Sequence, residues 1–231
     1  MRPFFLGLGL AWAAFAQQRT DAAAVLDRYL AHVPTACETS EHAVEMQIDA
    51  TLPKLEKQGT MYGLKVVSDT GQVAYRFLRF TGDKLIKTDV IARFLTAETQ
   101  ARQQTGDVSI SKANYKFKFV RTDAAAYVFE LKPRQKRSGL FKGELWLDPS
   151  TAEPVREKGE FVKAPSIFVK KIRFVRDYRI AAAACAPPAH TSITVQTRIA
   201  GNAEMTVVQR PVPSNWQPPT GEREAGSTAQ N

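Results

Sequence analysis

The sequence lacks the residue patterns that most catalytic and metal-binding sites require. It has two cysteines and three histidines in 231 residues, and His32, His42 and His190 are scattered without metal-ligand spacing. It has no Gly-x-Ser-x-Gly turn for a nucleophilic serine and no glycine-rich loop that would cradle phosphates. We therefore expect no catalytic residue, metal site or cofactor. An enzyme whose acids and bases converge from distant strands is the weaker alternative.

Long hydrophobic runs are also scarce, and the one present lies at the N-terminus. Residues 1–16 contain Arg2, an apolar stretch and the small-residue pattern Ala14-Phe15-Ala16, which together are typical of a cleaved signal peptide. A membrane anchor is the less favoured interpretation because the run is short for a bilayer span. We therefore expect an exported, periplasmic protein.

The two cysteines, Cys37 and Cys185, can form one disulfide in an oxidising compartment. That bond would close a loop of roughly 150 residues and stabilise the fold by about 4–5 kcal/mol in the chain-entropy model. Two unpaired buried thiols are the alternative.

The charge balance is basic, with a formal net charge of +9. Basic proteins bind nucleic acid, anionic membranes or acidic partners, but an exported protein seldom meets nucleic acid, which we exclude as a partner. Lys and Arg are spread along strand faces, which favours an ordinary solvated surface. Contact with anionic headgroups is the alternative, and the basic turn Lys132–Arg137 is a candidate for it beside the simpler interpretation of a solvated hairpin tip.

The stretch Gly139–Tyr178 contains three runs in which apolar and charged residues alternate with period two. Such alternation predicts strands of an antiparallel sheet with one solvated face. Trp146 falls on the charged face, where it can cover lysine stems. Glu153 and Glu157 are interpreted as ordinary surface charges.

The segments before this stretch predict two helices and further strands. An amphipathic helix is expected over Ala22–Val33. His42–Pro53 alternates as a strand, and a hairpin is expected around Asp69-Thr70-Gly71. A second helix is predicted over Thr88–Ala101, followed by a polar, mobile loop over Arg102–Lys112.

Alternation resumes around Tyr115 and Tyr127, and again after Tyr178 up to Val207. The tail from Pro211 is rich in Pro, Gly and polar residues and should be disordered. We find no internal boundary, so one domain is expected over residues 17–210 between the signal peptide and the tail at 211–231.

About eleven strands and two substantial helices make the chain mainly β. Two helices cannot cover the apolar face of an open sheet of that size. Either the sheet closes as a packed sandwich or barrel, or it curves into a half-barrel with the helices as a lid. The second arrangement leaves an apolar cavity for an acyl chain or a similar ligand. The pattern by itself does not choose between them.

A turn motif inside the central stretch resembles a known superfamily. Leu145-Trp146-Leu147-Asp148-Pro149, followed by Thr151 and Pro154-Val155-Arg156, is similar to a motif of the outer-membrane lipoprotein carrier (LolA-like) superfamily, and the stretch as a whole looks like an uncharacterised bacterial branch of it. The order of elements is also similar. The resemblance implies a strongly curved, unclosed antiparallel sheet (a half-barrel) with helices on its concave side.

The resemblance further implies a monomeric, non-catalytic carrier or chaperone that binds acyl chains of lipoproteins or other lipids and exchanges them with membrane-associated donor and acceptor proteins. A periplasmic sensor that regulates a protein partner is the alternative within the superfamily. Arg79 shares a predicted strand face with Val73, Tyr75 and Phe77 and is a candidate for an inward-facing arginine, beside the favoured interpretation of an edge or exposed arginine. The residues expected to line the cavity are Met46, Ile48, Phe77, Tyr115, Phe117, Phe119, Phe129, Leu145, Phe161, Ile172 and Phe174.

Overall fold

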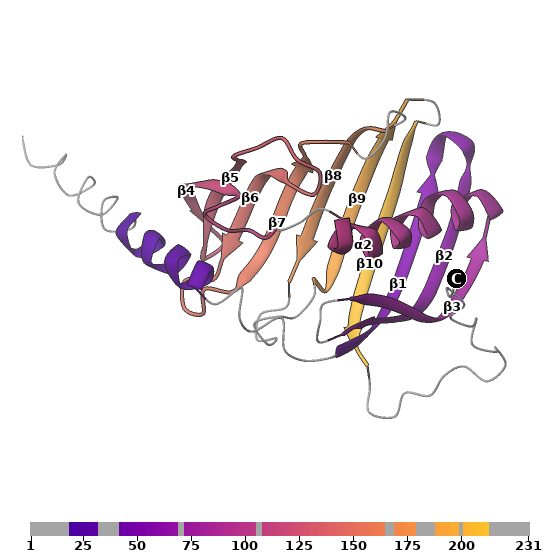
Figure 1. Cartoon of the computed structure of the whole chain (residues 1–231), viewed down its shortest axis with the longest axis horizontal. Helices are drawn as coiled ribbons and strands as arrows, with labels where there is room; N and C mark the ends of the chain where they lie inside the picture. Colours follow the sequence, from indigo (N-terminus) through magenta and orange to yellow (C-terminus); the bar gives the residue numbers. More distant parts are fainter. Residues whose placement is uncertain are drawn as a thin grey trace, which may run out of the picture.

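The computed structural model contains one ten-stranded antiparallel sheet that does not close, together with two main helical segments (Figure 1). The residues that the structure describes are 19–31, 42–68, 72–104, 108–164, 169–178, 188–198 and 201–212. The strands are β1 His42–Leu52, β2 Lys57–Val67, β3 Val73–Gly82, β4 Tyr115–Asp123, β5 Ala126–Pro133, β6 Phe141–Leu147, β7 Pro154–Phe161, β8 Val169–Asp177, β9 His190–Thr197 and β10 Asn202–Pro211. The predicted curved, open sheet is confirmed, with ten strands instead of about eleven. The expected signal peptide, the tail beyond residue 212 and both cysteines lie outside the described residues.

The strand order is β3-β2-β1-β10-β9-β8-β7-β6-β5-β4, so β3 and β4 form the two edges. Every neighbouring pair is antiparallel. Most neighbouring strands are also consecutive in sequence and are joined by hairpins. The pairing of β1 with β10 instead brings the first and the last strand of the chain side by side. The interrupted register near both edges marks β-bulges, which bend a sheet and increase its twist.

Both helical segments lie on the same face of the sheet (Figure 1). The N-terminal helix covers residues 19–31. The second segment begins with the π-helix η2, Ile86–Ile91, and continues as α2, Ala92–Gln104. Its start is capped by Asp83, whose carboxylate accepts a hydrogen bond from the Leu85 N–H at 2.8 Å. Among the described helices, none is long and apolar enough to cross a membrane.

The second helical segment is longer than the sequence predicts. The loop expected from Arg102 is helical as far as Gln104, and Val108 and Ile110 pack against the core. Period-two alternation does not predict these features, because residues 102–112 are mostly polar. The predicted loop therefore begins later than expected, and two of its apolar residues belong to the packed core.

Opposite the helices, the convex face of the sheet is charged, and several of its charges are paired across strands. Glu144 lies 3.2 Å from Lys158 Nζ and 3.3 Å from Arg121 Nη2. Burial raises the pKa of Glu144, but hydrogen bonds from Arg121 and Lys158 outweigh it and hold the pKa below its usual range. Trp146 lies beneath two of these cations, with Arg121 Cζ 5.7 Å and Lys158 Nζ 4.9 Å from the ring centroid, so it contacts the charged face as expected.

The turn between β6 and β7 has the hydrogen bonds that its sequence predicts. The Asp148 carboxylate accepts from the Ser150 N–H at 2.8 Å and from the Thr151 N–H at 2.9 Å. Arg28 of the N-terminal helix donates to the Pro149 carbonyl at 2.7 Å. The motif that resembles the carrier superfamily is thus also a contact point for the N-terminal helix.

Candidate ligand-binding face

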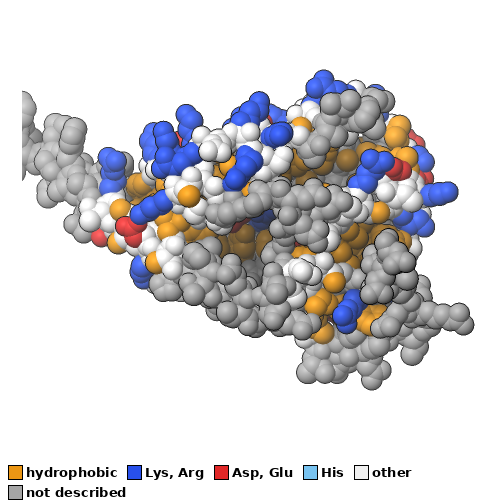
Figure 2. Space-filling model, viewed as in Figure 1, with side chains coloured by type: hydrophobic (Ala, Val, Ile, Leu, Met, Phe, Trp, Pro, Cys, Tyr) orange, Lys and Arg blue, Asp and Glu red, His pale blue; other side chains and the backbone are white. Residues whose placement is uncertain are grey.

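The concave face carries the apolar side chains and divides into two clusters. The first, here called the aromatic half, lies over β4–β8 and includes Tyr29 of the N-terminal helix; its buried rings are those of Tyr29, Tyr115, Phe129, Phe141 and Phe174. The second, here called the aliphatic half, lies over β1–β3 and β10 beneath η2 and α2; its buried residues are Met46, Ile48, Ala50, Leu52, Met61, Ile86, Ile91, Leu95, Ala203, Met205 and Val207. Figure 2 shows hydrophobic side chains along this face.

Nine predicted lining residues pack in these two clusters. Met46 and Ile48 are buried in the aliphatic half. Those in the aromatic half are Tyr115, Phe117, Phe119, Phe129, Leu145, Phe161 and Phe174. Ile172 lies between the halves, where it pairs with Val195 of β9. The structure therefore gathers these residues on one face, whereas their role as the lining of a ligand site stays a prediction.

Phe77 and Arg79 do not follow the predicted pattern because β3 has an irregular register. The pairing shifts between Tyr62 and Leu64, and Phe77 takes a left-handed backbone conformation with φ = 53°. Beyond this bulge the faces exchange, so Leu78 and Phe80 pack into the aliphatic half. Arg79 pairs with the exposed Tyr62 and is itself exposed, so the interpretation as an edge or exposed arginine is confirmed and the inward candidate is wrong.

Side chains in the two halves are largely covered by the helices, whereas those between the halves are not. Ile48 is 0% exposed and Phe129 is 1% exposed. In contrast, Ile172, Ile193 and Val195 of the central strands are only half-buried. Ile193 packs against both clusters. The central strands therefore connect the two halves along the concave face.

Helix α2 is attached to the sheet by a partly buried ionic contact. Glu98 forms a salt bridge with Lys65 of β2, whose side chain is only 9% exposed. Tyr75 of β3 donates its hydroxyl proton to the other Glu98 oxygen at 2.5 Å. This contact holds the middle of α2 over the aliphatic half.

A second buried polar group lies in the aromatic half and was missed by the sequence analysis. Glu157, expected to be a surface charge, is 4% exposed. It accepts hydrogen bonds from Arg176 Nη1 at 3.0 Å and from the Tyr178 hydroxyl at 2.9 Å. The signal was present in the sequence: Glu157 has the same parity in β7 as Phe161, and Arg176 the same parity in β8 as Phe174. A charged residue whose position in the alternation points to the concave face is thus buried together with an oppositely charged partner.

The Arg176 guanidinium also lies over the Phe174 ring, 4.4 Å from its centroid. Its side chain is 34% exposed, while that of its partner Glu157 is 6% exposed. Burial works against the charged form of Arg176, but the neighbouring Glu157 carboxylate outweighs it and raises the pKa of the guanidinium. Arg176 thus places a permanent positive charge beside apolar rings on the concave face.

Three tyrosines near this pair are held neutral. Burial is the main cause that raises the pKa of Tyr29, Tyr115 and Tyr178, and the Glu157 carboxylate raises each further. A phenolate in any of these positions would be both desolvated and repelled.

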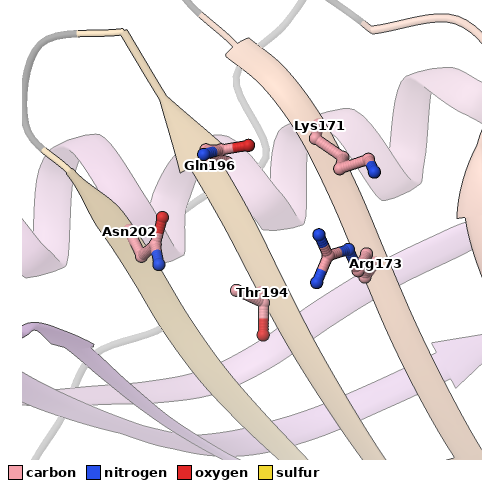
Figure 3. A pocket seen from close by; sticks show the side chains of 5 residues that line it. All are labelled: Lys171, Arg173, Thr194, Gln196 and Asn202. Carbon is pink, nitrogen blue, oxygen red and sulfur yellow. The ribbon is translucent and has the colours of Figure 1, made fainter.

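A separate, smaller hollow lies on the convex face, on the side of the sheet away from the apolar clusters. It has a volume of about 60 Å³ and is lined by Lys171, Arg173, Thr194, Gln196 and Asn202 of β8–β10 (Figure 3). Lys171 and Arg173 lie 2.6 and 3.8 Å from the same Glu160 oxygen, so their charges are partly neutralised. The hollow has room for little more than a few waters.

Comparison with known proteins places the chain near several solved structures. No protein-family model matches it, and no curated protein matches it. It is similar to a LolA superfamily protein from Nitrosomonas europaea, with 11% identity over 82% of this chain and 91% of that chain and a TM-score of 0.36. It is also similar to a DUF1329 family protein from Desulfovibrio piger, with 9% identity over 83% and 90% and a TM-score of 0.41.

A third similar structure, from Vibrio parahaemolyticus, is a domain named for outer membrane lipoprotein sorting, with 10% identity over 80% of this chain and 87% of that chain and a TM-score of 0.35. The superfamily that the turn motif resembles is therefore represented among these structures. At such identities and TM-scores, the likenesses carry nothing about what this chain binds.

Proposed function

We propose that the protein is a periplasmic carrier that binds the acyl chains of lipoproteins or other lipids on its concave face, without catalysis. The single observation that carries the proposal is the apolar surface that runs across the sheet and is left half-buried between the two covering helices. Burial of each CH₂ group contributes roughly 0.8 kcal/mol, so an acyl chain with many such groups gains substantial affinity from this surface.

The aliphatic half is the part that adapts to cargo. Met46, Met61 and Met205 are flexible, polarisable side chains that fill irregular spaces. The helix above them contains the π-helical segment η2, a feature that is often found at functional positions. Displacement of α2 from Lys65 would open this half, and the acyl chain would take the place of the helix.

The Arg176–Glu157 pair forms a polar boundary within the proposed binding face. Acyl chains would lie on the apolar residues on either side, and the partly exposed guanidinium would face the ester or carbonyl groups of the cargo. The pair is costly to bury, which is consistent with a role other than stability.

The experiment that tests the proposal is mass spectrometry of lipids extracted from the purified native protein. Reproducible acyl cargo supports a carrier. If no lipid copurifies and an apolar fluorescent probe does not bind, the carrier proposal fails.

A matched pair of substitutions on β9 locates the site. Val195→Asp places a charge on the half-buried concave surface, whereas Thr194→Asp places it on the opposite face of the same strand. We expect Val195→Asp to weaken binding of a fluorescent fatty acid by on the order of tenfold or more, because the carboxylate must be desolvated, while Thr194→Asp leaves it unchanged. Equal loss in both variants would place the site elsewhere.

A second candidate is a periplasmic interaction module that regulates a protein partner. It is favoured by the near-complete burial of residues such as Ile48 and Phe129, which describes a packed core as well as a closed carrier. Absence of copurified lipid, together with retention of a specific protein partner, would support this alternative.

A further inference from the structure

The described loop residues at the two ends of the strands differ in charge. Because all ten strands alternate in direction, their connecting loops fall at two opposite ends of the sheet. One end, here called the basic end, contains the β1–β2 loop, the segment from β3 to η2, residues 108–114 and the β5–β6, β7–β8 and β9–β10 loops. The other end contains the β2–β3, β4–β5, β6–β7 and β8–β9 loops.

The described loop residues at the basic end include eight basic and two acidic residues. The acidic ones are Glu56 and Asp83, and Asp83 is paired with Lys57 at 2.8 Å. At the opposite end, the described loop residues include Asp148 and Glu153 and no Lys or Arg. The basic loop residues are Lys54, Lys84, Lys112, Arg134, Lys136, Arg137, Lys163 and Arg198. Lys112 is paired with Asp27 of the N-terminal helix at 2.7 Å.

The basic side chains form a broad row instead of a compact pocket. They come from six segments that span all ten strands, a width of about 43 Å at the usual strand spacing. Seven of the eight are exposed. Figure 2 shows Lys and Arg side chains along the upper border of the molecule, where Figure 1 places the β9–β10 connection. A row of this width matches an extended anionic surface better than a short acidic peptide.

We propose that the basic end docks the protein on a bilayer that contains anionic phospholipids. Each Lys or Arg near such a surface adds to the attraction, which falls off within a Debye length. The less basic opposite end and the paired charges of the convex face give the molecule one preferred orientation on the bilayer, with the strands pointing away from it. This inference does not depend on acyl-chain binding, since it rests on the charge of the loops alone.

The test is cosedimentation of the exported protein with vesicles of phosphatidylcholine that contain roughly 30% phosphatidylglycerol, against vesicles of phosphatidylcholine alone. We expect binding to the anionic vesicles only, and its loss near 1 M salt, where the Debye length is about 3 Å. Binding that is equal for both vesicles, or absent from both, overturns the proposal.

Two triple variants with the same loss of charge then locate the contact. Lys54→Gln, Lys136→Gln and Lys163→Gln remove exposed charges from three loops of the basic end, and none of these lysines has a salt bridge among the described residues. We expect the partition coefficient to fall on the order of 100-fold, at about fivefold per lysine.

The control variant carries Arg76→Gln, Arg79→Gln and Lys118→Gln, which lie within β3 and β4 and are also exposed. They lie roughly 10 Å or more along the strands from the basic end, so their removal should change the partition coefficient by less than about threefold. Thermal unfolding checks that both variants fold. An equal loss in both variants means that net charge alone drives binding and overturns the proposed orientation, as does a basic-end variant that binds like the wild type.

Discussion

The aromatic and aliphatic halves cover similar parts of the concave face with different side chains. In the aromatic half, the rings contact one another in edge-to-face or tilted pairs, and Phe141 and Phe174 lie 4.9 Å apart at 80°. They also lie directly on the backbone, since a Cβ at Gly159 would come within 2.4 Å of the Phe141 ring. The aliphatic half instead contains three buried methionines and small or branched residues.

The two covering helices are also held differently. The N-terminal helix buries Ala22, Val25 and Tyr29 in the aromatic half, and its polar contacts are exposed: Arg28 donates to backbone carbonyls of the turn after Asp148, and Asp27 pairs with Lys112 at 2.7 Å. Helix α2 is held by the side chains of Lys65 and Tyr75 through Glu98. The difference indicates a rigid aromatic half and an aliphatic half that can be uncovered, and the predictions below test that contrast.

The largest effect is expected from Phe129→Ala in the aromatic half. Removal of a ring that is 1% exposed leaves a cavity among rigid neighbours, and we expect a loss of about 3–5 kcal/mol in the free energy of unfolding, measured with denaturant. The matched truncation in the aliphatic half, Met61→Ala, removes a side chain that is 0% exposed and should cost only about 2 kcal/mol, because its flexible neighbours Met46 and Met205 can relax into the space. Similar losses in both would remove the contrast.

An intermediate effect is expected from Glu98→Gln. The substitution leaves the nearly buried Lys65 ammonium without its anionic partner, and we expect a loss of about 1–3 kcal/mol. Hydrogen exchange should become faster in α2 and unchanged in β5 and β6. The variant Glu153→Gln, in an exposed turn, serves as the control. Unchanged exchange in α2 would show that Glu98 does not hold the helix.

Alkaline pH should affect the aromatic half first. The pKa values of Tyr29, Tyr115 and Tyr178 are raised by burial, so these groups stabilise the fold fully below the ordinary tyrosine pKa near 10. As pH rises above that value, the unfolded chain loses protons that the folded chain retains, and stability falls. Tyr29→Phe should reduce this slope in unfolding measured between about pH 9 and 11. An identical slope would contradict the assignment.

The smallest effect is expected at the turn that receives Arg28. Hydrogen bonds from Ser150 and Thr151 hold the pKa of Asp148 below its usual range. Its contribution is therefore present above about pH 4 and lost as pH falls through the lowered pKa. Asp148→Ala should cost about 1 kcal/mol at neutral pH and flatten the acid limb of the stability profile. Ser150→Ala keeps the carboxylate but removes the side-chain hydrogen bond that lowers its pKa most, so it should weaken that limb without abolishing it.

Much of the fold follows from period-two alternation. The bounds of β1, the turn chemistry after Asp148 and the position of Trp146 were all predictable from local sequence. Alternation fails where register changes, as at Phe77, because one extra residue in a bulge exchanges the faces of everything that follows.

The candidate site was harder to predict than the strands. The alternation of apolar residues identifies the concave face. It does not identify Glu157 and Arg176, because charged residues are interpreted as exposed even where the alternation places them on that face. The contact between Lys65 and Glu98 joins residues 33 positions apart on a strand and a helix. Only the three-dimensional path of α2 brings those two residues together.

Photocrosslinking with a diazirine-bearing fatty acid, followed by mass spectrometry of the labelled peptides, tests the central contrast most directly. If the aliphatic half is the part that opens, label will be found on β1, β2, β10 and α2, and Glu98→Gln will increase it. Label confined to β4–β6, or to the convex face, would contradict this account, as would the absence of labelling.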